Sequence, residues 1–231
     1  GMSYVMEIAK GTFEDVAGNA YLGTTRYKFA TTDTVTTAAT SYSLGAEANK
    51  LAYSGTSAFT GSGNDLANVI TGNVGNDTLY GALGNDTIRG GDGNDNLLGD
   101  SATLTTTDGN DSVSGGNGDD NIWGCGGNDI IDGGAGADIL YGQDGSDTVT
   151  GGAGNDFFVL ANAAYTGVDT FVDFTIGEDK IAFIKSNYSG LPATLTAADL
   201  LVGAGKTKPM AGEHLIYNTT AGALYYDADG L

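Results

Sequence analysis

Aspartates that recur at a fixed spacing are the residues of this sequence best suited to do chemistry. Aligned on Gly-X-Asp, they follow one another in steps of 12, 9, 9, 16, 9, 9, 9, 9 and 9 residues. Carboxylates are hard oxygen ligands, and Ca²⁺ takes about six to eight oxygens at about 2.3–2.6 Å. The spacing therefore predicts a row of calcium ligands. They are Asp65, Asp77, Asp86, Asp95, Asp111, Asp120, Asp129, Asp138, Asp147 and Asp156.

The nine-residue period predicts the elements that hold these aspartates in place. Six Gly-rich residues can turn sharply because glycine accepts positive φ, and the three residues that follow can form a short strand. Two repeats then complete one coil, which is twice as long as the period. Coils stack about 4.8 Å apart, so aspartates of successive coils should meet along the same edge.

The middle residue of each three-residue strand should point inward, because side chains alternate along a strand. All ten middle residues are apolar: Ile70, Leu79, Ile88, Leu97, Val113, Ile122, Ile131, Leu140, Val149 and Phe158. One apolar residue in nine gives a thin core, whereas ordering the backbone costs about 1–2 kcal/mol per residue. Bound cations are therefore expected to supply part of the stability.

The two longer steps are interpreted as insertions at turns, where extra backbone stays solvated. Ser101–Thr107 should loop out of the array between Asp100 and Asp108, and Leu66–Asn68 should do so more modestly before Val69. The repeats on either side should therefore belong to one continuous array.

Composition excludes several functions. The net charge is −20, with 24 Asp but only five Glu, so nucleic acid and anionic lipid surfaces are unfavourable partners. No stretch approaches the roughly 20 apolar residues of a membrane span. Cys125 and His214 are the only Cys and His, too few soft ligands for zinc. Magnesium is disfavoured because it keeps its waters and demands tighter octahedral geometry.

Segments such as Gly133–Tyr141 and Gly151–Val159 match G-G-x-G-x-D-x-U-x, where U is a large apolar residue. The chain thereby resembles the RTX (hemolysin-type) calcium-binding nonapeptide-repeat proteins, as the C-terminal module of a bacterial protein exported by type I secretion. The resemblance implies an all-β fold with a right-handed parallel β-roll over residues 61–160. Residues 1–60 would then hold an N-terminal segment and irregular capping coils, and residues 161–231 a small β-rich cap with a secretion-signal-like region.

In that family each ion lies between turns n and n+2 and is held by the sixth-position Asp and backbone carbonyls. Carried over to this chain, the resemblance implies about eight Ca²⁺ ions. The implied pairs are Asp65 with Asp86, Asp77 with Asp95, Asp86 with Asp111, Asp95 with Asp120, Asp111 with Asp129, Asp120 with Asp138, Asp129 with Asp147, and Asp138 with Asp156.

The segment after the array, Asp169–Phe174 and Gly177–Ile181, resembles the one that closes the open end of such rolls. Asp169 either completes a last site opposite Asp147 or is a simple surface acid. Further on, Thr196–Leu201 predicts a short capped helix. His214–Asn218 and Ala223–Asp227 predict a hairpin.

The function implied is calcium binding that drives folding of a secreted, extracellular and monomeric module, with calcium and the type I secretion machinery as partners. An alternative is a surface adhesin or an S-layer-like structural module, and a further one is an accessory domain of a secreted hydrolase. Neither H-E-x-x-H nor G-x-S-x-G occurs, so catalysis within this chain is not expected.

Overall fold

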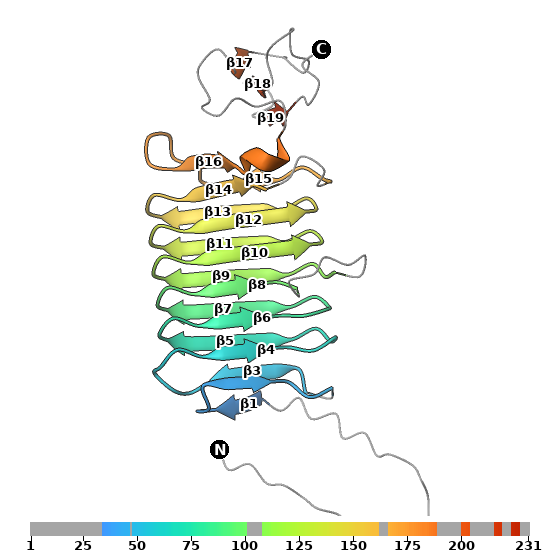
Figure 1. Ribbon diagram of the computed structural model, residues 1–231, viewed down its shortest axis with the longest axis vertical. Coiled ribbons are helices and arrows are strands. Elements are labelled where there is room, and N and C mark those ends of the chain that lie inside the picture. The colour runs from blue at the N-terminus through green and yellow to red at the C-terminus, as the bar shows by residue number, and fades with distance from the viewer. Residues whose placement is uncertain are drawn as a thin grey trace, which may run out of the picture. The chain divides into compact units, whose positions relative to one another are not determined.

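The computed structural model describes residues 34–46, 48–100, 108–161, 166–188, 200–203, 215–218 and 223–226, which fall in one of the two compact units of the chain, residues 32–231. Two sheets of eight strands each run along the stacked coils (Figure 1). Helix is limited, among the described residues, to one short 3₁₀ turn, Lys185–Asn187. The expected all-β fold with parallel coils is confirmed.

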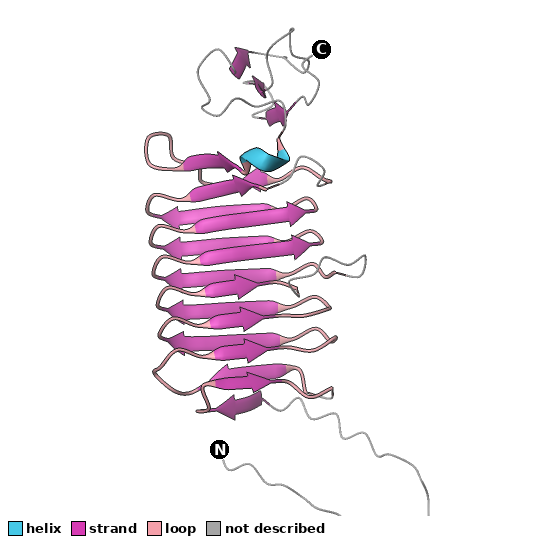
Figure 2. Ribbon diagram, in the orientation of Figure 1, coloured by secondary structure: helices cyan, strands magenta, loops and turns pink. Residues whose placement is uncertain are grey.

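The strands alternate between the two sheets along the chain, so that each sheet pairs every second strand in parallel (Figure 2). The first sheet consists of β1 (Thr34–Thr37), β3 (Lys50–Tyr53), β5 (Val69–Val74), β7 (Thr87–Asp92), β9 (Ser112–Asn117), β11 (Ile130–Ala135), β13 (Thr148–Ala153) and β15 (Thr170–Phe171). The second consists of β2 (Ser41–Ser43), β4 (Thr60–Ser62), β6 (Thr78–Tyr80), β8 (Asn96–Leu98), β10 (Asn121–Gly126), β12 (Ile139–Asp144), β14 (Phe157–Leu160) and β16 (Lys180–Phe183).

The register of the strands follows the length of the coil. Where the coil is regular, residues that meet in neighbouring coils are 18 residues apart, as Asp77 and Asp95 are. Across the longer step they are 25 residues apart, as Asp86 and Asp111 are. The difference of seven (25 − 18) equals the length of the expected insertion Ser101–Thr107, which lies outside the described residues. Strands β7 and β9, on either side of this segment, still pair in register, so the first sheet continues across the insertion.

The prediction of a second insertion, at Leu66–Asn68, is wrong. Thr60 of β4 pairs with Thr78 of β6, so this coil has the regular length. Gly63-Asn64-Asp65 looks like the end of a repeat because it contains Gly-X-Asp. The coil length nevertheless puts Asn68, nine residues before Asp77, at the sixth position of this turn.

The core is a single column of side chains between the two sheets. All ten residues predicted to point inward are at most 1% exposed. On β4, Gly61 takes the inward place, and the buried ring of Phe59 fills the space that a side chain there would need. At the C-terminal end Phe158 packs against Phe171 and Phe174, with ring centroids 4.7 and 5.7 Å away. Aromatic rings thus close the C-terminal end of the column, whereas beyond Phe59 the core continues to the buried Leu51 and Leu44.

A small sheet follows the roll. It consists of β17 (Leu200–Gly203), β18 (Leu215–Asn218) and β19 (Ala223–Tyr226). The antiparallel pairing of β18 with β19 confirms the predicted hairpin. The predicted helix is wrong at its C-terminal end, because Leu200 and Leu201 belong to a strand that pairs with β18. Its remaining residues, 196–199, lie outside the described part of the chain.

Candidate metal centre

The repeated aspartates form two ladders, one along each edge of the roll. In each ladder the backbone N–H of one aspartate donates to Oδ1 of the aspartate one coil later, as between Asp111 and Asp129 at 2.8 Å. Seven of the eight expected pairs show this contact. They are 77 with 95, 86 with 111, 95 with 120, 111 with 129, 120 with 138, 129 with 147, and 138 with 156.

The other carboxylate oxygen, Oδ2, is buried in most of these aspartates without a hydrogen-bond partner in the described part of the chain. The sixth-position aspartates from Asp77 to Asp156 are only 0–2% exposed. In nearly all of them Oδ2 is buried and has no hydrogen-bond partner among the described residues; Asp77 differs, because its Oδ2 accepts from the Asn73 N–H at 3.1 Å. A buried charged oxygen without a partner is strongly unfavourable. These atoms are Oδ2 of Asp86, Asp95, Asp111, Asp120, Asp129, Asp138, Asp147 and Asp156.

The first glycine of each turn leaves space beside this bare oxygen. A Cβ built on Gly115 would collide with Oδ2 of Asp120 and press on the carbonyl oxygen of Gly133, one coil later. The same two kinds of atom meet at Gly90, where they are Asp95 Oδ2 and the Gly115 carbonyl oxygen. Each turn of this kind therefore brings one carboxylate oxygen and one backbone carbonyl oxygen of the next coil to the same small space.

Burial raises the pKa of these carboxyl groups, and the charges of neighbouring aspartates add to the effect, while the backbone N–H donors oppose it. The pKa is raised to about 8 for Asp86 and Asp129. The pKa is raised to about 7 for Asp111, Asp120 and Asp147, and to about 6 for Asp95 and Asp138. The pKa values of Asp77 and Asp156 are raised as well. Without a cation, folding thus shifts these carboxyl groups toward the protonated, neutral form.

This donor set fits calcium. Ca²⁺ binds carboxylate and carbonyl oxygens in flexible geometry, and its charge would offset the bare Oδ2 atoms. No group of three or more His, Cys, Asp or Glu side chains within the described ranges is arranged to hold a metal. Side chains alone therefore cannot complete a site, and backbone carbonyls such as those of Gly115 and Gly133 must contribute. A shell of oxygens from backbone and aspartate suits calcium rather than zinc.

The expected pairing of Asp65 with Asp86 is wrong. Asp65 is exposed, and the backbone N–H that donates to Asp86 Oδ1, at 2.7 Å, is that of Asn68. The coil length decides which residue enters the ladder, whatever its type. The ladder on this edge thus begins with an amide side chain in place of a carboxylate.

The C-terminal ends of the ladders contain acids that follow the array. The Asp147 N–H donates to Asp169 Oδ1 at 3.1 Å, so of the two alternatives for Asp169 the structure favours the place opposite Asp147. On the other edge the Asp156 N–H donates to Asp179 Oδ1 at 3.0 Å. Asp179 was not among the predicted ligands, although Gly177-Glu178-Asp179-Lys180-Ile181 repeats the Gly-X-Asp-X-apolar pattern. Asp173 accepts from the N–H groups of Gly151 and Gly152, both at 2.8 Å.

Two further residues lie beside one ladder. Asp100 is fully buried, and its Oδ2 has no hydrogen-bond partner among the described residues. Sequence reasoning missed it because it is outside the Gly-X-Asp pattern. Cys125 is a buried residue near the end of β10 with φ of +79°, and burial raises the pKa of its thiol to about 12. The thiol is therefore protonated at neutral pH and is a poor nucleophile.

Comparison with known proteins agrees with this geometry. A family model described as the RTX calcium-binding nonapeptide repeat (4 copies) matches residues 59–97, 98–131 and 126–158. A search of the curated proteins gives no match. In the part of the chain that the structure describes, no helix is long and apolar enough to cross a membrane. The matched segments contain the sixth-position aspartates from Asp77 to Asp156 and the turns that carry them, so residues 59–158 match the RTX calcium-binding nonapeptide repeats.

Proposed function

We propose that this chain is a module whose folding is driven by calcium, with one ion between successive turns along each edge of the roll. The observation that carries the proposal is the repeated buried Oδ2 without a hydrogen-bond partner, set beside a carbonyl oxygen of the next coil. About eight ions per chain are expected, held mainly by the paired aspartates within residues 61–160. Asp65 is left out of the proposed ligands because it is exposed, whereas Asp169 is retained.

Calcium binding and folding are coupled because neither is favourable alone. The ladders form only when coils stack, so the unfolded chain has no such sites. The stacked chain without calcium buries a row of carboxyl groups in a molecule of net charge −20. Binding free energy therefore becomes folding free energy. The module would stay unfolded where calcium is scarce and fold where it is abundant.

Folding that depends on calcium suits an exported protein. A chain that is unfolded in a low-calcium cytosol can be threaded through a type I secretion channel and then fold outside the cell as a monomeric module. The family assignment supports this context, since RTX repeat proteins are typically secreted. The proposed role is one of binding and folding rather than of catalysis.

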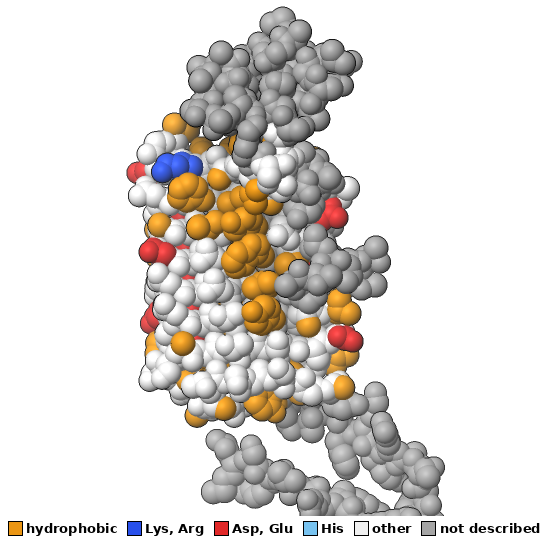
Figure 3. Space-filling view, viewed as in Figure 1, with side chains coloured by type: hydrophobic (Ala, Val, Ile, Leu, Met, Phe, Trp, Pro, Cys, Tyr) orange, Lys and Arg blue, Asp and Glu red, His pale blue; other side chains and the backbone are white. Residues whose placement is uncertain are grey.

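One observation favours adhesion as a second function. Hydrophobic side chains form a stripe on the outer face of the second sheet (Figure 3). Trp123 and Tyr141 lie on this sheet with their rings stacked at a centroid distance of 5.3 Å, and beside them is a hollow of about 480 Å³ lined in part by Tyr80 and Leu98. A partly exposed aromatic surface of this kind is common at sites that bind other molecules.

The number of bound ions tests the proposed function. Equilibrium dialysis of metal-stripped protein against calcium, followed by elemental analysis, is expected to give about eight Ca²⁺ per chain. Magnesium at the same concentration should not occupy these sites, because it demands shorter bonds and octahedral geometry. A chain that binds one calcium ion or none at millimolar calcium would contradict the proposal.

A further inference from the structure

The turn that contains the seven-residue insertion differs from the others in its charge. Asp100 follows the first glycine of this turn, Gly99, and Asp108 and Asp111 belong to the same turn. In the other described turns the residue after the first glycine is uncharged. Those residues are Asn64, Asn73, Ala82, Gly91, Gly116, Cys125, Gly134, Gln143 and Gly152. The sequence of this turn therefore contains three aspartates, where the other turns of the array contain one or two.

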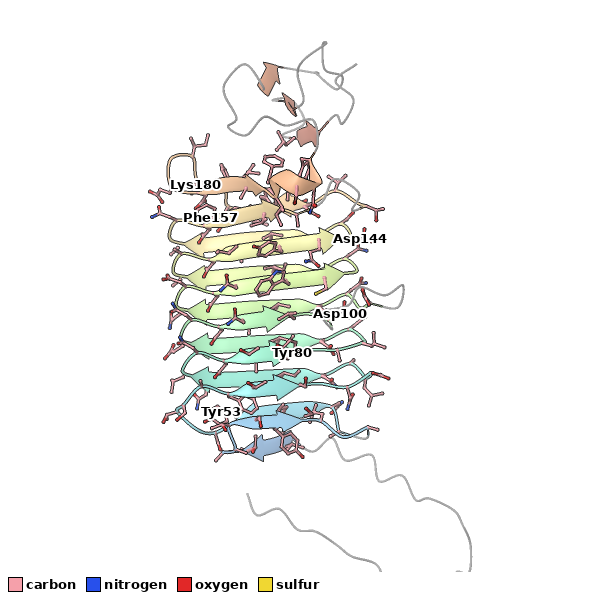
Figure 4. All side chains as sticks on the ribbon, in the orientation of Figure 1. Tyr53, Tyr80, Asp100, Asp144, Phe157 and Lys180 are labelled. Atoms are coloured by element: carbon pink, nitrogen blue, oxygen red, sulfur yellow. The ribbon has the colours of Figure 1, made fainter. Side chains whose placement is uncertain are left out.

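The carboxylate of Asp100 is buried and only half satisfied. The residue has 0% exposure, and its Oδ1 accepts from the Gly109 N–H at 3.2 Å. Its Oδ2 is buried with no hydrogen-bond partner among the described residues, as in the ladder aspartates. Asp100 and Asp144 lie on the same edge of the roll (Figure 4). A second kind of carboxylate thus presents a bare oxygen at this edge.

The surroundings of Asp100 already contain atoms that suit a cation. At the neighbouring Gly99, Asp111 Oδ2 and the carbonyl oxygen of Gly124 share the space where a Cβ would be. The Asp108 carboxylate packs against Gly126, in the turn of the next coil. Asp100 Oδ1 accepts from the N–H of Gly109, two residues before Asp111, so Asp100 is held against the end of the turn that carries Asp111.

We propose that Asp100 Oδ2 is an additional ligand for a calcium ion held at the insertion turn, and that this turn carries the tightest cation site of the roll. The inference rests on the proposed calcium binding and extends it to a residue outside the repeat pattern. Calcium affinity rises with the number of charged ligands and with the rigidity of the site. Here Asp100 adds a fixed carboxylate to the one that Asp111 supplies, and Asp108 adds a third charge nearby.

A purely structural role for Asp100 makes a different prediction. Its Oδ1 accepts the Gly109 N–H, and an asparagine side chain can accept the same bond through its own oxygen. Asp100→Asn therefore preserves the structural contact and removes the charge and the anionic ligand. The matched control is Asp92→Asn, because Asp92 is an exposed residue at the end of β7, on the other edge, and its Oδ1 accepts from Asn117 at 2.7 Å.

The test is a calcium titration of the metal-stripped full chain in competition with a chromophoric chelator. Asp100→Asn is expected to raise the Kd of the tightest site about tenfold or more and to leave the weaker sites unchanged. Asp92→Asn should leave the tightest site as in the wild type. If Asp100→Asn does not fold at saturating calcium, Asp100→Gly replaces it, since glycine stands at this position in four other turns.

A tight site that is unchanged in the Asp100 variant would overturn this inference and leave the proposed function intact. Equal weakening in the Asp100 and Asp92 variants would overturn it as well, because the effect would then be one of net charge. A wild-type chain that binds no calcium would overturn the proposed function itself.

Discussion

Gly115→Ala should abolish one calcium site in the middle of the array. The new Cβ would occupy the space between Asp120 Oδ2 and the carbonyl oxygen of Gly133, both of which are proposed ligands. Gly133 belongs to the next coil, and a backbone oxygen cannot move aside as a flexible side chain can. Overpacking and the lost ion together should lower the free energy of unfolding by about 3 kcal/mol or more at saturating calcium. Denaturant unfolding followed by circular dichroism measures this loss.

Gly45→Ala is the matched control for this substitution. A Cβ on Gly45 would meet no atom within 4 Å, and the residue is exposed. Its stability and its bound calcium should stay within error of the wild type. If Gly115→Ala bound as much calcium as Gly45→Ala, the carbonyl and carboxylate oxygens at Gly115 could not be the ligands of an ion.

The stability of the calcium-free fold should fall as the pH rises from about 4 to about 8. Burial raises the pKa of Asp86 and Asp129 from 3.8 to about 8, so the folded chain binds more protons than the unfolded chain within this window. Stability is then fully present below pH 4 and is lost as the pH rises through the pKa values of the folded state. Metal-stripped protein should accordingly be β-rich near pH 4.5 and unfolded near pH 8.

Calcium should reverse the direction of this dependence. Protons and calcium compete for the same carboxylates, so binding strengthens as the pH rises, and with it the stability of the calcium-bound fold. Thermal melts in metal-free and in calcium-containing buffers of equal ionic strength, recorded from pH 4.5 to 8, measure both trends. Stability that does not change with pH in the absence of metal would show that the ladder carboxyl groups are not desolvated as described.

The fold could be predicted from the sequence because one short period specifies it. Nine residues determine both which side chain points inward, such as Ile122, and which carboxyl group reaches the edge, such as Asp120. Stacking by coils of 18 residues then fixes the partners, here Asp138 for Asp120. The length of the insertion before Asp108 could also be read, because the pattern resumes in phase after it.

Other site residues could not be found from the period alone. Asp65 matched the Gly-X-Asp pattern, but the coil length gives its expected place to Asn68. The burial of Asp100, and the bond that its Oδ1 accepts from the Gly109 N–H, depend on how its turn folds, which a motif does not reveal. Asp179 belongs to a segment whose spacing from Asp156 is 23 residues, longer than a regular coil, so counting by coils misses it.

Far-UV circular dichroism of metal-stripped protein during calcium titration at neutral to slightly alkaline pH tests the central claim most directly. The claim is that the stacked carboxylates need a hard dication between coils. A transition from coil to β-structure as calcium is added, which magnesium at equal concentration does not produce, is the predicted result. A chain that is equally rich in β-structure before any calcium is added would contradict the account.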